Sequence, residues 1–139
     1  MRGIQAERNL VRQLWKKGFA VMRAPSSGSS TKMDRPDIIA GNKIKGLQFA
    51  IEVKTTLKEC LYIKEKSIKQ LVEFSQRFGC QSILAIKFKG RRRNWIFIKP
   101  DQLSFTPSLN YKITFRNALR FGIDFKTLIK EGKQTKIYH

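Results

Sequence analysis

The stretch LQFAIEVKTT, residues 47–56, decides the predicted fold and raises the question of how a strand tolerates charge. Successive side chains of a β-strand point to opposite faces of a sheet. Apolar residues fall on one face here, and Glu52 and Lys54 project side by side from the other. A charged side chain on a packed strand is costly unless another group compensates it. An ordinary solvent-facing ion pair is one interpretation, and a functional site is the other.

The segments around this strand predict an alternation of helices and strands. Apolar residues recur at helical spacing over residues 4–17, where Leu10 and Trp15 broaden the predicted apolar face, and over residues 64–78. Gly18 and Gly79 follow these helices and favour their termination. Further strands are predicted at 19–24, 37–41, 81–88 and 94–99.

This order predicts an α/β fold with a mixed central sheet of about five strands, flanked by helices. The last forty residues are less regular. We expect a partly helical segment over 115–125 and a basic C-terminal helix or tail from about Lys126. The chain is long enough for one compact domain, spanning residues 1–139.

The charge balance points to a polyanionic partner. The chain carries 29 Lys and Arg against 10 Asp and Glu, a formal net charge of +19. Nucleic acid is the favoured partner because neutralised phosphates release condensed counterions, and an anionic membrane surface is the alternative. No apolar run approaches a membrane-spanning length and no signal-peptide pattern opens the chain. We therefore expect an intracellular, cytoplasmic protein that inserts in no membrane.

Cysteine and histidine offer little chemistry. Cys60 and Cys80 do not form a metal-binding spacing, and His139 is the only histidine. Catalysis is thereby limited to carboxylates, lysine and hydroxyls, and no small-molecule cofactor is expected.

Two further acids change the interpretation of the strand. Asp37 follows Pro36 at the start of a predicted strand, where it is either a turn residue or a carboxylate that reaches the neighbouring strand. Glu7 lies beside the apolar stripe of the first helix, where it is either a solvated first-turn acid or a third inward acid. Clustered carboxylates repel one another. A divalent cation such as Mg²⁺, which prefers oxygen ligands and keeps several waters, would compensate them.

Two basic segments are candidates for DNA contact. The loop over residues 25–36 is rich in serine and is either simply flexible or close to a phosphate backbone, with Lys32 and Arg35 beside it. The turn KGRRR, residues 89–93, would follow a duplex arm through phosphate contacts, which position DNA without reading its sequence.

The spacing of these residues resembles a known motif. RPD at 35–37 and EVK at 52–54 resemble the PD-(D/E)xK nuclease motif. The wider sequence, QAERNLVRQLWKKGFAVMRAPSSGSS, PDIIAGN, AIEVKTT, LVEFSQRFG and ILAIKFK, is similar to the archaeal-type Holliday junction resolvases over roughly residues 3–90. The resemblance implies a restriction-endonuclease-like fold and a Mg²⁺-dependent endonuclease, in which Mn²⁺ substitutes, acting on four-way DNA junctions.

The resemblance also implies roles for particular residues. Glu7, Asp37 and Glu52 would surround the metal with the Val53 carbonyl as a backbone ligand, and Lys54 would be the motif lysine. Ser27 best matches the family's loop serine, with Ser26, Ser29 and Ser30 as alternatives. The expected DNA-binding residues are Arg8, Arg23, Lys32, Arg35, Arg91, Arg92 and Arg93.

A four-way junction calls for two related incisions, and the resemblance implies a homodimer with twofold symmetry. Phe74, Phe78 and the segment WIFI (95–98) are either interface or core. Two other functions stay open. One is a nuclease of the same fold that cuts duplex or flaps. The other is a basic DNA-binding protein without activity.

Overall fold

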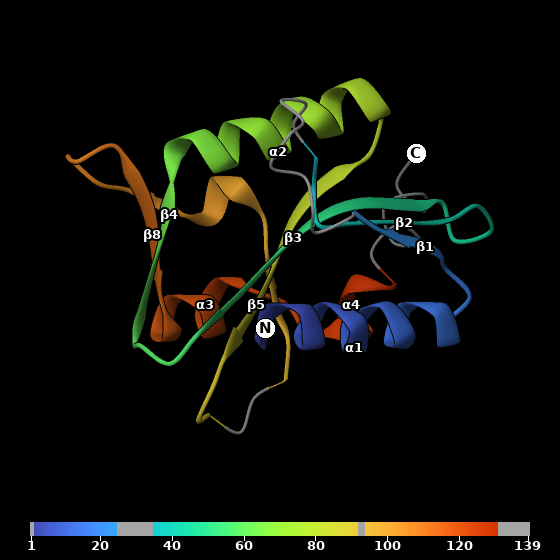
Figure 1. The fold of residues 1–139 in the computed structure, drawn as a ribbon, viewed down its shortest axis with the longest axis horizontal. Coiled ribbons are helices and arrows are strands. Elements are labelled where there is room, and N and C mark those ends of the chain that lie inside the picture. The colour runs from blue at the N-terminus through green and yellow to red at the C-terminus, as the bar shows by residue number, and fades with distance from the viewer. Residues whose placement is uncertain (1, 25–34, 92–93, 131–139) are drawn as a thin grey trace.

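The computed structural model describes residues 2–24, 35–91 and 94–130 (Figure 1). The N-terminal half contains α1 (Arg2–Lys16), β1 (Ala20–Arg23), β2 (Ile38–Asn42), β3 (Leu47–Thr56), β4 (Cys60–Lys64) and α2 (Glu65–Phe78). The C-terminal half contains β5 (Gln81–Phe88), β6 (Ile96–Ile98), the 3₁₀ turn η2 (Pro100–Gln102), β7 (Ser104–Phe105), β8 (Asn110–Thr114), α3 (Phe115–Phe121) and α4 (Phe125–Leu128).

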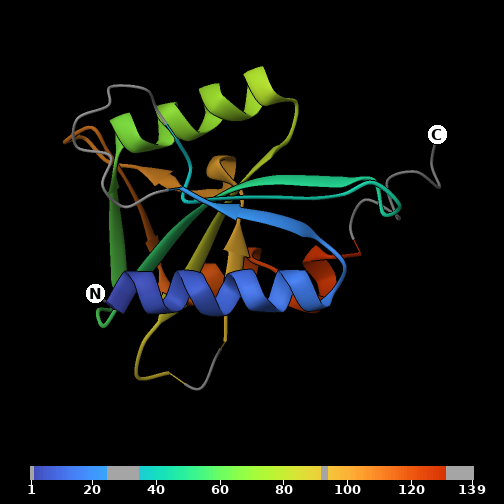
Figure 2. The same cartoon turned by 45° about the vertical axis from the view of Figure 1, so that its right-hand side comes forward.

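A mixed sheet with the strand order β1-β2-β3-β5-β6 forms the centre of the fold, so the predicted five-stranded α/β architecture is confirmed. The strand quoted above, β3, lies in the middle, antiparallel to β2 and parallel to β5. Helix α2 covers one face and α1 the other (Figures 1 and 2).

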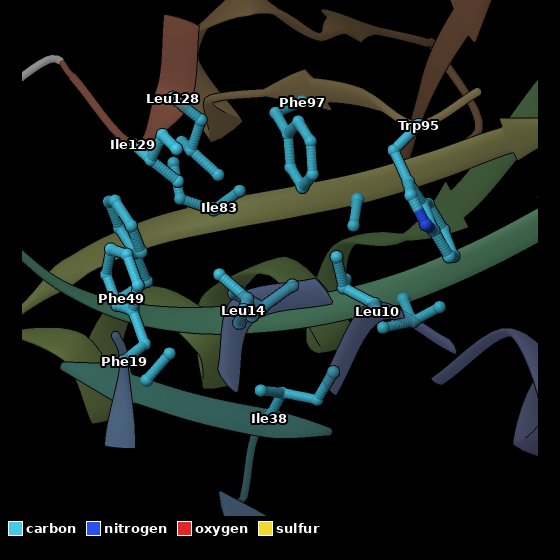
Figure 3. Packing of buried hydrophobic residues seen from close by; sticks show 14 of the residues in the cluster. Leu10, Leu14, Phe19, Ile38, Phe49, Ile83, Trp95, Phe97, Leu128 and Ile129 are labelled. Carbon is cyan, nitrogen blue, oxygen red and sulfur yellow. The ribbon is translucent and has the colours of Figure 1, made fainter. Parts of the chain in front are cut away.

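The core on the α1 face is made by residues from both ends of the chain. Leu10 and Leu14 of α1 are fully buried, and Phe19 stacks on Phe49 with 5.9 Å between ring centroids (Figure 3). Burying a leucine contributes about 1.5–3 kcal/mol. Trp15 does not broaden this apolar face as expected. It is 67% exposed, because it lies one residue beyond the buried stripe and points away from the sheet.

The core on the α2 face is built around Ile68 and Leu71 of α2, with Ser75 buried on the same helix. The segment 95–98 is buried throughout, so its apolar residues fill the core and are not interface. Phe78 is different. It is 56% exposed and stacks on Phe74, with ring centroids 5.7 Å apart.

A second, three-stranded sheet with the order β4-β8-β7 was not predicted. Its strand β4 leads directly into α2, which begins at Glu65. At the C-terminus the helical segment over 115–125 is confirmed in part by α3. The expected helix or tail from about Lys126 begins within the short helix α4, and residues 131–139, over most of which it was expected, lie outside the described residues.

No helix in the described ranges is long and apolar enough to cross a membrane.

Candidate active site

The start of β2 determines the position of Asp37. Strand β3 continues past its last pair with β2, in which Ile51 lies opposite Ile38. The Val53 N–H beyond that pair points toward the missing continuation of β2, and the Asp37 Oδ2 accepts it at 2.8 Å. The carboxylate therefore completes the hydrogen bonding of the strand and is fixed at the edge of the sheet. The prediction that the Asp37 carboxylate reaches the neighbouring strand is therefore confirmed.

Glu52 and Lys54 lie on the α2 face of β3, the face that carries the fully buried Ala50. The Lys54 Nζ is 3.9 Å from the Glu52 Oε2, and the two side chains are 33% and 20% exposed. Side chains this enclosed do not form the solvent-facing ion pair that was the alternative interpretation.

Glu7 reaches the same region from α1. Its Oε1 accepts a hydrogen bond from the Arg23 Nε at 3.2 Å, and the Arg23 and Glu7 side chains are 25% and 17% exposed. Glu7 is therefore not a solvated first-turn acid. Alternation along β1 turns Arg23 toward α1, and α1 carries Glu7 above this end of the sheet.

Three acids influence one another electrostatically at this site. Burial raises the pKa of Glu52 to about 7, with the negative charges of Asp37 and Glu7 contributing and Lys54 opposing. Burial also raises the pKa of Asp37, assisted by Glu7 and opposed by the hydrogen bond from Val53 and by Lys54. The acid on α1 is therefore close enough to the acids at the start of β2 and on β3 to disfavour the ionised forms of Asp37 and Glu52.

The residues present fit a hard divalent cation. No group of three Asp, Glu, His or Cys side chains in ranges 2–24, 35–91 and 94–130 is arranged to hold a metal ion, so Glu7, Asp37 and Glu52 do not form a three-carboxylate cage. Mg²⁺ does not need such a cage, since one or two carboxylates suffice when waters and substrate phosphates complete the coordination. Asp37 and Glu52 provide two carboxylates whose mutual repulsion a cation would relieve.

The structure places the other predicted residues less centrally. Arg8 and Arg35 lie on α1 and just before β2 respectively, and Arg35 is exposed. Arg91 forms an ion pair with Glu59. Ser27, Lys32, Arg92 and Arg93 lie outside the described residues, as do the alternatives Ser26, Ser29 and Ser30.

Two ion pairs between distant segments of the chain were missed from sequence. Arg23 was considered only as a DNA contact, although the alternation of β1 places it on the α1 face and could have indicated Glu7 as its partner. The pair between Glu59 and Arg91 has no such signal. It joins two turns 32 residues apart that only the folded sheet brings together.

A five-stranded mixed sheet that presents an Asp just before the start of one strand, and a Glu and a Lys two residues apart on the next, is typical of a nuclease of the PD-(D/E)xK class. The family model described as archaeal Holliday junction resolvase (Hjc) matches residues 1–137. The chain belongs to this family, as the motifs predicted.

Curated relatives and a solved structure agree with this placement. The crossover junction endodeoxyribonuclease Hjc of Methanocaldococcus jannaschii is 43% identical over 136 residues, covering 98% of this chain and 92% of that protein. The protein of the same name from Archaeoglobus fulgidus is 39% identical, covering 81% of this chain and 78% of that protein. The structure of Archaeoglobus fulgidus Hjc, a Holliday junction resolvase, aligns with a TM-score of 0.81 at 34% identity, covering 91% of this chain and 99% of that chain.

Proposed function

We propose that this protein is a structure-selective endonuclease that resolves four-way DNA junctions by divalent-metal-dependent phosphodiester hydrolysis. Mg²⁺ is the proposed metal, with Mn²⁺ able to replace it. The observation that carries this proposal is the enclosed pair of Asp37 and Glu52, which repel each other beside a lysine in a chain of net charge +19. A protein that acts on chromosomal or viral DNA would be located in the cytoplasm of an archaeal cell or of an infected host cell.

Asp37, Glu52 and the Val53 carbonyl are the proposed metal ligands, and Glu7 completes the shell through water because its carboxylate is held by Arg23. A divalent ion held there would supply the positive charge that withdraws electron density from the scissile phosphate. Lys54 holds a compact ammonium beside Glu52 and stabilises the negative charge that grows on the phosphate oxygens. Arg23 keeps Glu7 oriented toward this site.

The remaining residues are proposed to hold DNA. Ser27 would contact the backbone near the cut. Arg8 follows Glu7 on α1, and Arg35 lies two residues before Asp37. Both cations would bind phosphates that flank the cleaved bond. Such contacts position DNA without reading bases, so cleavage should depend on branch structure more than on sequence.

A homodimer is proposed because the two incisions in a junction are related by twofold symmetry. The stack of Phe74 and the exposed Phe78 near the end of α2 supports an interface on this helix. An aromatic pair that is partly exposed in the monomer gains burial when a second copy covers it.

Replacing Phe78 with Glu is expected to shift the protein from dimer to monomer and to uncouple the two incisions. The reason is that a charge would be buried without a partner in the interface. Light scattering after size exclusion measures the mass, and a plasmid cruciform distinguishes paired from single incisions. Gln76→Glu adds the same charge at an exposed position of α2 and should leave the dimer intact. An unchanged dimer in Phe78→Glu would exclude this interface.

The function is tested with a synthetic immobile four-way junction and a linear duplex of the same arm sequence. The wild-type protein should cut the junction in Mg²⁺ at a rate at least about 100-fold above the duplex, and should not cut in EDTA. Junction affinity should fall steeply with salt because phosphate contacts dominate it. Equal cleavage of both substrates would indicate the duplex-cutting alternative. Binding without any metal-dependent cleavage would indicate a non-enzymatic DNA-binding protein.

A further inference from the structure

Two turns and the start of a helix meet at the C-terminal end of β3. The turn after β3 (57–59), the turn after β5 (89–91) and the start of α3 are joined by backbone hydrogen bonds. The Lys89 N–H donates to the Thr56 carbonyl at 2.7 Å, and the Phe115 N–H donates to the Glu59 carbonyl at 2.8 Å. Residues 89–91 and the start of α3 are distant in the chain from Glu7, Asp37, Glu52 and Lys54 of the candidate active site, whereas the turn 57–59 follows Lys54 by three to five residues.

The side chain of Arg91 holds these three segments together. Its guanidinium donates to the Glu59 carboxylate and lies over the Phe115 ring, 4.7 Å from the centroid. Phe115 in turn packs edge-on against Phe88, with ring centroids 5.1 Å apart. Arginine suits this role because its planar group makes a directed ion pair and stacks on an aromatic ring at the same time. We call Glu59, Arg91 and Phe115 the distal anchor.

Cations surround the distal anchor. Lys58 and Arg116 adjoin Glu59 and Phe115 in the chain, while Lys89 is tied to Thr56 through its backbone. The one acid of the anchor, Glu59, is already paired with Arg91. The surroundings are therefore cationic, and a polyanion is the partner that this surface fits.

The distance to the active site fits a duplex arm. Thr56, to which Lys89 is bonded, lies four residues beyond Glu52 on the same extended strand, or about 13 Å at the usual rise per residue. That length corresponds to about four base pairs of duplex. Lys54 is nearer to Thr56, at two residues or about 7 Å along the strand. Cations at this end of the sheet would therefore meet phosphates that flank the cleaved bond along an arm, and not the proposed metal site.

We propose that the distal anchor fixes a second DNA contact surface, made by Lys58, Lys89 and Arg116, which holds a duplex arm away from the cut. This inference rests on the proposed function. Arg91 was expected from sequence to bind DNA directly. Here it is a positioning residue that acts through the turns it joins, and Glu59, an acid, supports DNA binding.

Two variants separate the anchor from a simple charge effect. Glu59→Gln removes a negative charge, so a simple charge effect predicts tighter junction binding. Arg91→Lys keeps the positive charge, so a simple charge effect predicts unchanged junction binding. If the distal anchor positions the three cations, both variants should bind the junction more weakly. The loss of affinity at physiological salt should be about fivefold for each phosphate that the protein no longer neutralises. The slope of log affinity against log salt should also become shallower by about one for each such phosphate.

Fluorescence anisotropy in EDTA, over a range of salt concentrations, measures affinity and slope, and single-turnover cleavage at saturating protein measures the chemical step. The cleavage rate should stay within about twofold of wild type, since the anchor lies outside the active site. Glu73→Gln is the matched control, because Glu73 forms an exposed ion pair with Arg77 on α2. Its affinity and salt slope should not fall.

The outcomes distinguish this inference from the proposed function. If the wild-type protein resolves junctions, but Glu59→Gln binds them as tightly as wild type or more tightly with the salt slope unchanged, the distal anchor is refuted and the function stands. If the wild-type protein does not prefer junctions to duplex, the proposed function fails first. Circular dichroism shows whether each variant is folded, and the exposure of Glu59 favours an intact fold.

Discussion

Replacement of Asp37 by Asn is expected to reduce junction cleavage by about a thousandfold or more while leaving junction affinity within a few-fold of wild type. The amide oxygen of Asn still accepts the hydrogen bond from Val53, so the edge of β3 keeps its geometry. The negative charge that would hold the metal is lost. Lewis-acid stabilisation of the developing charge is worth several kcal/mol, which corresponds to a rate effect of this size.

Single-turnover cleavage in Mg²⁺ and binding in EDTA measure the two quantities separately. Asp101→Asn is the matched control, because Asp101 is an exposed acid in η2, away from β2 and β3. It should cut at the wild-type rate. Normal cleavage by Asp37→Asn would remove Asp37 from the site.

The metal-free protein is expected to lose stability as pH rises, and Glu52→Gln is expected to abolish much of this loss. The folded-state pKa of Glu52 is raised from 4.5 to about 7, so the folded protein binds the proton more tightly than the unfolded chain. The stability that this proton contributes is fully present below about pH 4.5 and is lost as pH rises through about 7. A shift of this size corresponds to about 3 kcal/mol, and the raised pKa of Asp37 acts in the same direction.

Urea unfolding in EDTA at about pH 5 and about pH 8 measures this effect as the difference between wild type and Glu52→Gln. The variant should be the more stable protein at the higher pH by up to about 3 kcal/mol and should lose that advantage at the lower pH. Glu73→Gln, a substitution on the surface of α2, should follow wild type at both values. If wild type and Glu52→Gln lose the same stability between the two pH values, the burial and repulsion assigned to Glu52 are wrong.

The strands around the site were predictable because their side chains obey a simple period. The ranges 47–56 and 81–88 match β3 and β5 residue for residue, since both carry long apolar runs bounded by turns. Strand β4 was missed although Leu61 and Ile63 alternate with the exposed Tyr62. It is short and runs directly into α2, and no element was predicted between the strand over 47–56 and the helix over 64–78.

The acids and the lysine of the site could be predicted from chain spacing, because Asp37 precedes one strand and Glu52 and Lys54 share a face of the next. Their partners could not. The pair of Glu7 with Arg23 depends on how α1 packs across β1, and the pair of Glu59 with Arg91 depends on two turns meeting. Trp15 was misplaced because an aromatic residue beside an apolar stripe was counted as part of it.

Direct titration of the protein with Mn²⁺, followed by the loss of the free-ion electron spin resonance signal, tests most directly whether Asp37 and Glu52 share one cation. Wild type should bind one ion per chain at this site, and Asp37→Asn and Glu52→Gln should each weaken that binding by about 100-fold or more, with Asp101→Asn unchanged. Equal binding by wild type and both variants would show that the two carboxylates do not form a metal site, and a cationic DNA-binding domain would be the remaining interpretation.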